Sequence, residues 1–271
     1  MTVADIPLGL RLARQAGWNQ VEADWQRFLA MQPDGCFVGE LDGAAVATTA
    51  AFIFGPIAWI AMVLVDVDSR RRGVATTLLK HALDFLDARG VQTIRLDATA
   101  AGQPVYEKLG FVPEYGLTRY TGTAALSDGG FAPAGDKPQL DDVIALDRWA
   151  TATPRAKLLT RLLAESPDLT RVLRREGRLE GYITGRRGAN ATQIGPCIAT
   201  AQAGPVLLTE ALSYCAGRPV FIDVPHDHAA ARQIVETRGL TAQRHFLRMC
   251  RGTRIRDRVG AIWASSGPEK G

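Results

Sequence analysis

The sequence predicts an α/β protein with a mixed sheet, in which the same order of strands and helices occurs twice. Short apolar runs that suit strands alternate with segments of helical periodicity, which is typical of this fold class. A stretch rich in glycine, proline, alanine and serine, residues 121–139, separates the two series. We therefore expect one domain over residues 1–122, a linker over 123–138, a second domain over 139–252 and a tail over 253–271.

The composition is that of a globular protein, because apolar residues make up 46% and charged residues 22% of the chain. The 32 basic side chains exceed the 28 acidic ones by four and are dispersed, so nucleic-acid binding is not indicated. Cys36, Cys197, Cys215 and Cys250 lie far apart, which favours reduced, buried thiols. The sequence has neither an export signal nor an apolar run of roughly 20 residues that could span a membrane. We expect a cytoplasmic monomer or homodimer without a membrane partner.

The first series begins with amphipathic helices over residues 8–31. Asp42-Gly43 is a hairpin turn pair, so the flanking segments, residues 36–40 and 44–53, are predicted to be antiparallel strands. Residues 59–65 form an apolar run too short for a typical helix, which indicates a strand buried on both faces.

A helix is predicted over residues 73–89, because its apolar positions recur at helical spacing and Arg89-Gly90 provides a C-terminal stop. A strand over residues 91–98 and a short helix over 103–109 follow. A strand, a helix and a strand in this order require a crossover connection. The strands at 59–65 and 91–98 are therefore expected to be parallel neighbours.

The second series repeats this order after the linker. Its predicted elements are helices over residues 140–149 and 154–165, strands over 171–174, 181–186 and 191–194, a helix over 205–215, a strand over 220–224 and a helix over 229–237. The tail contains apolar residues and is expected to dock onto the folded chain.

The most informative segment is the loop between the strand at residues 59–65 and the following helix. It ends in Arg70-Arg71-Arg72-Gly73-Val74-Ala75, and the helix starts inside this hexamer. The first turn of a helix has unpaired backbone N–H groups and a positive partial charge, so it stabilises an anion. Gly73 and Ala75 allow a pyrophosphate close to the backbone, and the arginines add positive charge. The alternative interpretation is an arginine-rich solvated loop that precedes an ordinary helix. Other phosphate-binding loops are excluded, because neither GxxxxGK[ST] nor GxGxxG occurs in the chain.

This loop resembles the signature [RQ]-x-x-G-x-[GA] of the GNAT superfamily of N-acetyltransferases, with Arg70, Gly73 and Ala75 at its defined positions. Residues 96–111, LDATAAGQPVYEKLGF, are similar to the second half of the family's signature, whereas Val67 stands where many relatives have proline. The resemblance implies tandem GNAT folds, acetyl-CoA as cosubstrate and transfer of its acetyl group to a primary amine. We expect a small-molecule acceptor.

The resemblance also implies which residues contact the coenzyme. Backbone groups of Val63 and Val65 would hydrogen-bond the pantetheine arm and the acetyl carbonyl, and the amides from Arg71 through Thr76 would hold the pyrophosphate. The full set of implied contacts is Val63, Leu64, Val65, Arg70, Arg71, Arg72, Gly73, Val74, Ala75, Thr76 and Gly102.

Two candidate catalytic residues follow from the same resemblance. Tyr106, four residues before Gly110, matches the family's tyrosine general acid, which would protonate the departing thiolate; packing in the core is its alternative role. Asp97, near the carboxyl end of its predicted strand, is a candidate for binding or deprotonating the amine. A structural role for Asp97, with water as the base, is the alternative.

The acceptor pocket is expected between the N-terminal helices and the segment after Gly110. Aromatic rings that face a cleft can stack on an acceptor, and the candidate substrate contacts are Trp18, Asn19, Asp97 and Tyr115. His226-Asp227-His228 has no third metal ligand nearby in the sequence, so a surface loop is favoured over a metal site.

The second series keeps the signals of the scaffold. Gly110 and Arg119 are nine residues apart, as are Gly239 and Arg248. This equal spacing indicates that the two segments are copies of one another.

The second series lacks the residues that are expected to bind the coenzyme and to act as general acid in the first series. Asp223 corresponds loosely to Asp97, but Val235 stands at the position of Tyr106. The segment AQAGP at residues 201–205 replaces the arginine loop, and its proline has no N–H to donate. This pattern resembles the degenerate C-terminal GNAT-like domain of a group of two-domain bacterial acetyltransferases. We expect it to pack on the first domain and to shape the acceptor cleft.

Two alternative functions are open at this point. One is a protein acetyltransferase that acts on lysines or N-termini, and the other is a non-catalytic regulatory module that binds acyl-CoA. The module would keep the loop at residues 70–75 but would have no use for Tyr106. No acidic groove for basic protein tails is visible in the sequence, which favours a small amine.

Overall fold

The computed structural model describes residues 1–125 and 138–271; residues 126–137 of the expected linker lie outside the described part. The described strands form one mixed sheet in the order β1-β2-β3-β4-β10-β5-β9-β8-β7-β6, and β11 pairs with β8 outside this path. The prediction of an α/β fold with a mixed sheet is confirmed. No helix in the two described ranges is long and apolar enough to cross a lipid bilayer.

The first half forms the predicted helices and strands in the predicted order, and it adds one strand, over residues 112–123, that the sequence analysis does not predict. Its helices are α1 (Ile6–Gln15), α2 (Glu22–Met31), α3 (Val74–Asp87) and α4 (Gln103–Lys108), and its strands are β1 (Cys36–Leu41), β2 (Ala44–Phe54), β3 (Ile57–Val65), β4 (Thr93–Ala98) and β5 (Val112–Thr123). β1, β2 and β3 are antiparallel neighbours. β3 and β4 are parallel, as the crossover through α3 requires.

The second half repeats this order. It comprises α5 (Leu140–Thr151), α6 (Ala156–Glu165), β6 (Arg171–Arg175), β7 (Arg178–Arg187), β8 (Thr192–Ala199), α7 (Ala203–Tyr214), β9 (Pro219–Pro225), α8 (Ala229–Thr237), β10 (Thr241–Gly252) and β11 (Ile262–Ala264). β8 and β9 are a parallel pair on either side of α7, like β3 and β4 around α3.

Alternation of side chains along β2 and β3 separates two apolar cores. Phe52 and Trp59 pack with α1 and α2 on one face of the sheet, whereas Ala51 and Ile60 pack with α3 on the other. All four cysteines are buried and free of disulfides, as expected.

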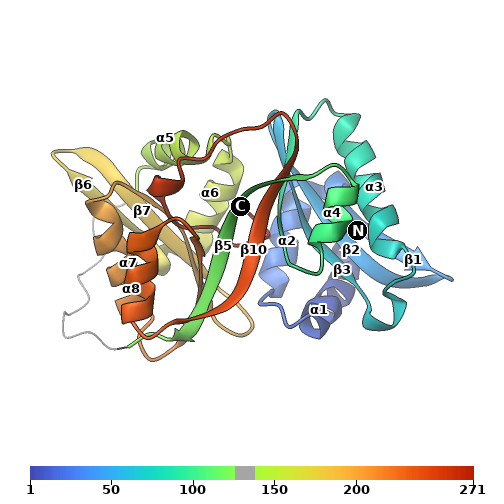
Figure 1. The fold of residues 1–271 in the computed structure, drawn as a ribbon, viewed down its shortest axis with the longest axis horizontal. Helices are drawn as coiled ribbons and strands as arrows, with labels where there is room; N and C mark the ends of the chain where they lie inside the picture. Colours follow the sequence, from blue (N-terminus) through green and yellow to red (C-terminus); the bar gives the residue numbers. More distant parts are fainter. Residues whose placement is uncertain (126–137) are drawn as a thin grey trace.

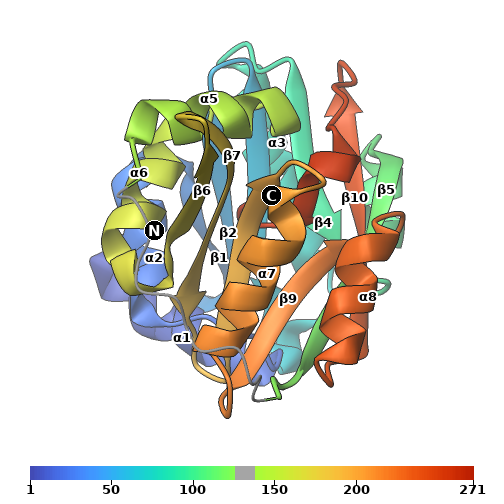
Figure 2. The same cartoon turned by 90° about the vertical axis from the view of Figure 1, so that its left-hand side faces the viewer.

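β5 and β10 are exchanged between the two halves. β10 lies between β4 and β5 and is antiparallel to both, and β5 lies between β10 and β9. Figure 1 shows these two strands in the middle of the molecule, with β1, β2 and β3 on one side and β6 and β7 on the other. Figure 2 shows the second half from its end, with β6, β7 and β9 toward the viewer. Each half therefore completes its part of the sheet with a strand of the other half. The expected boundaries at residues 122 and 139 divide the sequence into two series but not the sheet into two separable units.

Candidate active site

A cavity of about 350 Å³ opens where β3 and β4 separate. The two strands pair only over residues 57–59 and 93–95, and they diverge beyond that point. The cavity is lined by residues 60–65 of β3, by Leu96 and Asp97 of β4, and by Val105 and Tyr106 of α4. The backbone edge of β3 therefore faces an open slot instead of a neighbouring strand.

A bulge in β3 shapes this slot. The register with β2 shifts between Thr48 and Ala50, and Met62 has a φ of 55°. The hydroxyl of Thr48 donates to the carbonyl oxygen of Met62 at 2.9 Å, which holds the irregular backbone. Bulges bend a strand and re-aim its groups, and they are common beside functional sites.

The loop from β3 to α3 presents unpaired amides at the mouth of the cavity. Arg71 and Gly73 have φ values of 61° and 82°, so the chain turns sharply before α3 begins at Val74. The first backbone N–H bonded back into this turn is that of Thr77, which donates to Gly73 at 3.0 Å. Among the described residues, no carbonyl accepts from the amides of residues 71–76. This is the geometry that binds an anion at a helix N-terminus.

The arginines of this loop have different neighbours. Arg70 lines the cavity, and its Nε donates to the Val65 carbonyl at 3.1 Å. Arg72 forms an exposed ion pair with Asp42 at 3.0 Å. Exposed ion pairs contribute little to the free energy of folding. Arg72 could therefore leave Asp42 and pair with a phosphate at little cost. Ala75 and Gly102 also line the cavity, so the start of α3 and the slot between β3 and β4 border the same cavity.

Tyr106 lies on α4 with its ring against the cavity. A Cβ on Gly102 would lie 2.9 Å from the Tyr106 ring, so glycine is what allows this close packing. The edge of Phe111 contacts the ring at a centroid distance of 5.9 Å. Burial raises the pKa of Tyr106 to about 12. The phenol therefore stays protonated near neutral pH and can donate a proton.

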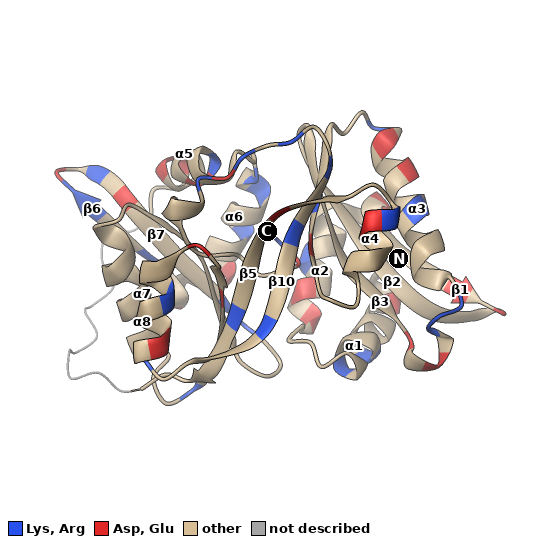
Figure 3. Cartoon of the chain, viewed as in Figure 1, with Lys and Arg blue, Asp and Glu red and all other residues tan. Residues whose placement is uncertain are grey.

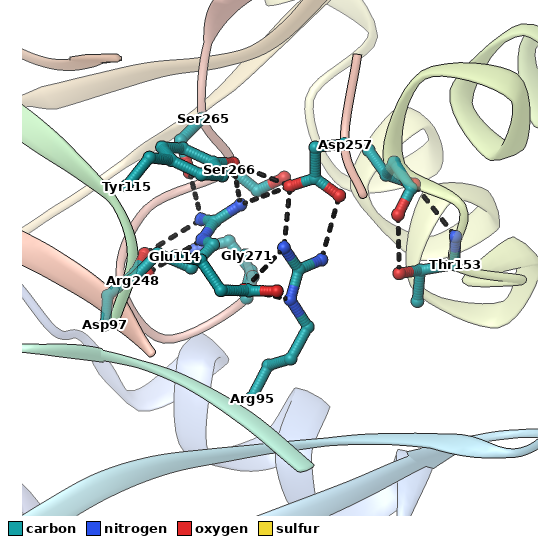
Figure 4. Close-up of polar contacts among 12 residues, drawn as sticks. Arg95, Asp97, Glu114, Tyr115, Thr153, Arg248, Asp257, Ser265, Ser266 and Gly271 are labelled. Carbon is teal, nitrogen blue, oxygen red and sulfur yellow. Dashed lines mark hydrogen bonds and ion pairs between the residues drawn. The ribbon is translucent and has the colours of Figure 1, made fainter. Parts of the chain in front are cut away.

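Asp97 also lines the cavity, but both of its carboxylate oxygens are engaged. Arg248 Nε donates to Oδ1 at 2.8 Å, and the Arg248 Nη2 donates to Oδ2 at 2.9 Å (Figure 4). Burial raises the pKa of Asp97, and the charge of Arg248 opposes this rise. The bidentate pair favours the structural alternative for Asp97, because both oxygens already accept hydrogen bonds from Arg248, whose positive charge opposes protonation of the carboxylate.

Tyr115 does not line the cavity. Its hydroxyl accepts from Arg248 at 2.7 Å and donates to Asp257 at 2.6 Å. The guanidinium of Arg95 donates to both oxygens of Asp257 at 2.9 Å, and Figure 4 shows these side chains converging from strands of both halves. Tyr115 therefore belongs to a buried network that fastens the exchanged strands.

Trp18 lines the cavity, whereas Asn19 points away from it into the second half. The Asn19 Oδ1 accepts from the backbone N–H groups of Asn190 and Ala191 at 2.8 and 3.1 Å. Its Nδ2 donates to the Ala191 carbonyl at 2.9 Å. Asn19 thus fixes the connection between α1 and α2, and with it the positions of Trp18 and Gln20 on the cavity wall.

Several cavity residues come from the second half of the chain, and sequence patterns do not identify them. They are Arg244 and Phe246 of β10, and Pro268 and Glu269 of the tail. Arg119 of β5, from the segment after Gly110 that is expected to form the acceptor pocket, also lines the cavity. The equal spacing from glycine to arginine in the two series is the only sequence signal near them. It indicates equivalent segments but does not reveal that these segments change places.

The corresponding slot of the second half is filled by the chain itself. β8 and β9 pair over residues 192–194 and 220–222, and β11 then pairs with β8 at Ile198 and Cys197. Trp263 is 2% exposed, and its Nε1 donates to the Ala199 carbonyl at 3.2 Å. A Cβ on Gly204, at the start of α7, would lie 1.9 Å from the Trp263 ring. This position therefore has no room for a coenzyme.

Comparison with known families agrees with both halves of this description. A model described as the acetyltransferase (GNAT) family matches residues 10–111, and one described as an acetyltransferase (GNAT) domain matches residues 143–264. The fold and the cavity thus define an acyltransferase. The chain belongs to the GNAT acetyltransferase family, and it carries that domain twice.

Individual relatives are similar over most of the chain. An uncharacterized N-acetyltransferase of Bacillus subtilis, YitH, is 27% identical over 233 residues, which cover 82% of this chain and 79% of the relative. The crystal structure of a candidate acetyltransferase from Pyrococcus horikoshii has a TM-score of 0.84 at 25% identity, covering 100% of this chain and 94% of that one. A ribosomal protein bS18-alanine N-acetyltransferase of Salmonella typhimurium is 44% identical over 52 residues, which cover 18% of this chain and 35% of that protein.

Proposed function

We propose that this protein transfers the acetyl group of acetyl-CoA to the primary amine of a small molecule, in the cavity between β3 and β4. The observation that carries the proposal is the joint placement of the free loop amides and of Tyr106 around one cavity. The diphosphate would lie on the amides of residues 71–76. The pantetheine arm would run along the unpaired edge of β3, and residues 63–65 would hydrogen-bond it.

The reaction is a direct transfer. The neutral amine attacks the thioester carbonyl, the C–N bond forms, and the C–S bond breaks. Tyr106 donates its proton to the departing sulfur, and the nitrogen loses a proton to water, since Arg248 holds Asp97 and opposes its protonation. Tyr106 is then reprotonated from solvent, which closes the cycle.

The walls of the cavity favour a small acceptor. Phe246, Pro268 and Glu269 of the second half line it together with residues of the first half, so both halves limit the space for an acceptor. The Salmonella relative is named for acting on an alanine of a ribosomal protein. Peptides are therefore included among the acceptors to be tested. Release of free thiol from acetyl-CoA, measured with amino acids, amino sugars, polyamines and peptides, identifies the class. Thiol release with peptides alone would contradict a small acceptor, and release with none of the four would favour the regulatory module.

A carboxylate placed in the phosphate loop should weaken coenzyme binding. Ala75→Asp adds a negative charge at the first turn of α3, where the pyrophosphate would lie. Repulsion of about 1–2 kcal/mol corresponds to a Kd for coenzyme A that is about 10-fold higher or more. Titration calorimetry measures this change. Ala75→Ser, which is similar in size and uncharged, should bind almost as well as the wild type; equal weakening by serine would point to steric damage instead.

A single coenzyme should bind per chain. Trp263 and β11 occupy the equivalent slot of the second half, and the proline at position 205 has no N–H for a phosphate. Titration calorimetry with acetyl-CoA is therefore expected to give a stoichiometry of about one. A value of about two would mean that β11 leaves its place, contrary to the packing of Trp263.

A further inference from the structure

The acceptor side of the cavity carries an unbalanced positive charge. Arg119 of β5 and Arg244 of β10 both line it, and they are directly opposite one another in the strand register. Like charges at such a position destabilise a strand pair unless something compensates them. Among the described residues, a carboxylate forms an ion pair with Arg119 but not with Arg244.

Asp223 neutralises Arg119. The Arg119 Nε and Nη2 each donate to one Asp223 oxygen at 2.8 Å, and the two residues are register partners across β5 and β9. Both side chains are buried. The carboxylate of Asp223 therefore has its two oxygens engaged by Arg119, with Gln193 as an additional donor at 3.3 Å.

Arg244 forms no ion pair or hydrogen bond among the described residues. β10 extends past the end of β4, since Leu247 pairs with Ala98, so Arg244 lies beside the gap that forms the cavity. Burial lowers the pKa of Arg244 and the charge of Arg119 lowers it further, whereas the more distant charge of Asp223, which is bonded to Arg119, opposes this fall. Figure 3 shows basic positions on neighbouring stretches of β5 and β10. A half-buried guanidinium beside a second one is a place for an anion.

The position equivalent to Arg244 in the first half has a different residue. Arg244 precedes Arg248 by four residues, as Tyr115 precedes Arg119. Tyr115 is engaged by Arg248 and Asp257 in the buried network. Where the first half has a bonded tyrosine, the second half thus has an arginine that lines the cavity and has no hydrogen-bond or ion-pair partner among the described residues.

One carboxylate at the cavity has an oxygen with no side-chain donor among the described residues. Asp97 is engaged on both oxygens, whereas Glu269 uses Oε1 for Arg186, at 3.1 Å, and for Lys270. Among the described residues, no side chain donates to Oε2 of Glu269, and this residue lines the cavity. A carboxylate oxygen that faces a cleft can accept a hydrogen bond from an amine.

We propose that the acceptor carries an anionic group, a carboxylate as in amino acids, beside its primary amine, with Arg244 pairing with the anion and Glu269 Oε2 holding the amine. This inference rests on the proposed acetyl transfer to a small amine. It narrows the acceptors from amines in general to molecules that present both charges. Polyamines and simple alkylamines are excluded as good substrates.

Matched pairs of acceptors test the proposal. Each amino acid is compared with its carboxamide, which has the same size and the same α-amine but no negative charge. The carboxamide lowers the pKa of its amine and so favours the reactive neutral form, which means that a preference for the acid must come from the protein. Ethanolamine phosphate and ethanolamine form a second pair, which distinguishes a phosphate from a carboxylate. The wild type should prefer an amino acid over its carboxamide by about 10- to 150-fold in kcat/KM, as expected for a hydrogen bond between charged groups.

Variants assign this preference to residues. Arg244→Gln should lower kcat/KM for the acid to near that of the amide, and Arg244→Lys should restore part of it. Glu269→Gln should raise KM for both members of a pair and leave their ratio unchanged. Arg256→Gln, an exposed arginine away from the cavity, is the matched control and should change nothing. Coenzyme A affinity, measured by calorimetry on each variant, reports an intact coenzyme slot.

The outcomes separate the two proposals. Equal use of acid and amide by the wild type, or an unchanged ratio in Arg244→Gln, overturns the anionic acceptor while acetyl transfer stands. A preference for ethanolamine phosphate over every amino acid overturns the carboxylate. No thiol release with any amine, or no coenzyme binding, overturns the proposed function and the acceptor class together.

Discussion

Tyr106→Phe is expected to lower kcat by about 100- to 10,000-fold, the usual contribution of a positioned general acid, with little change in the affinity for acetyl-CoA. The substitution removes one oxygen and keeps the ring that packs between Gly102 and Phe111. Without the phenol, the coenzyme sulfur would leave as a thiolate in a partly closed cavity. Steady-state rates of thiol release and calorimetric binding of acetyl-CoA measure the two quantities separately.

A matched control distinguishes chemistry from packing. Tyr120 is also buried, and its hydroxyl donates to the exposed Glu236 at 3.1 Å, away from the cavity. Tyr120→Phe should therefore retain nearly full turnover. Because the pKa of Tyr106 is raised to about 12, the acid stays protonated below that pH. The wild-type rate should rise with pH as the acceptor amine loses its proton, and it should decline only as the pH approaches about 12. Full turnover in Tyr106→Phe would falsify the acid assignment and leave water as the proton donor.

Arg248→Met is expected to lower the free energy of unfolding by about 3–5 kcal/mol, because breaking a buried ion pair leaves an uncompensated charge. Arg248 and Asp97 are each 2% exposed and are joined by two hydrogen bonds. Arg248 also donates to Tyr115 and to Ser265, so one substitution removes the centre of the network between the halves. Urea unfolding followed by tryptophan fluorescence measures the loss.

The control is an arginine on the same strand. Arg251 pairs with Asp87 at 2.9 Å, but the two side chains are 33% and 46% exposed. Arg251→Met should cost less than about 1 kcal/mol, as is usual for surface pairs. Similar losses for the two variants would contradict the view that the buried pair fastens β4 to β10.

The sequence predicts the first half of the fold well because its signals are local. The turn at Asp42-Gly43, the apolar run of β3 and the periodicity of α3 each depend on residues close in the chain. The anion-binding character of the arginine loop can likewise be predicted, since its backbone amides and its positive charge belong to one short segment. The predicted strand–helix–strand order also gives the parallel pair that opens the cavity.

The strands β5 and β10 are not predicted, because the residues that stabilise them are far away in the sequence. β10 carries Arg244, Arg248 and Arg251, and no local pattern indicates that one of these arginines is buried. Arg248 is buried because Asp97 lies opposite it, 151 residues away in the chain. For the same reason, Arg244 and Glu269 cannot be assigned to the cavity from sequence, and Asn19 and Tyr115 are predicted in it although they fasten the two halves. The assignments of Tyr106 and of the coenzyme contacts stay predictions until the experiments above are done.

The exchange of β5 and β10 gives the molecule the architecture of a two-subunit assembly joined into one chain. In an assembly of two identical chains, a change that closed one slot would close both. In a joined chain, the second copy could fill its slot with Trp263 while the first kept its own open. That copy cannot be discarded, because its strand completes the sheet of the working half. The exchange therefore preserves a half whose own slot is filled, and it places residues of that half on the wall of the open cavity.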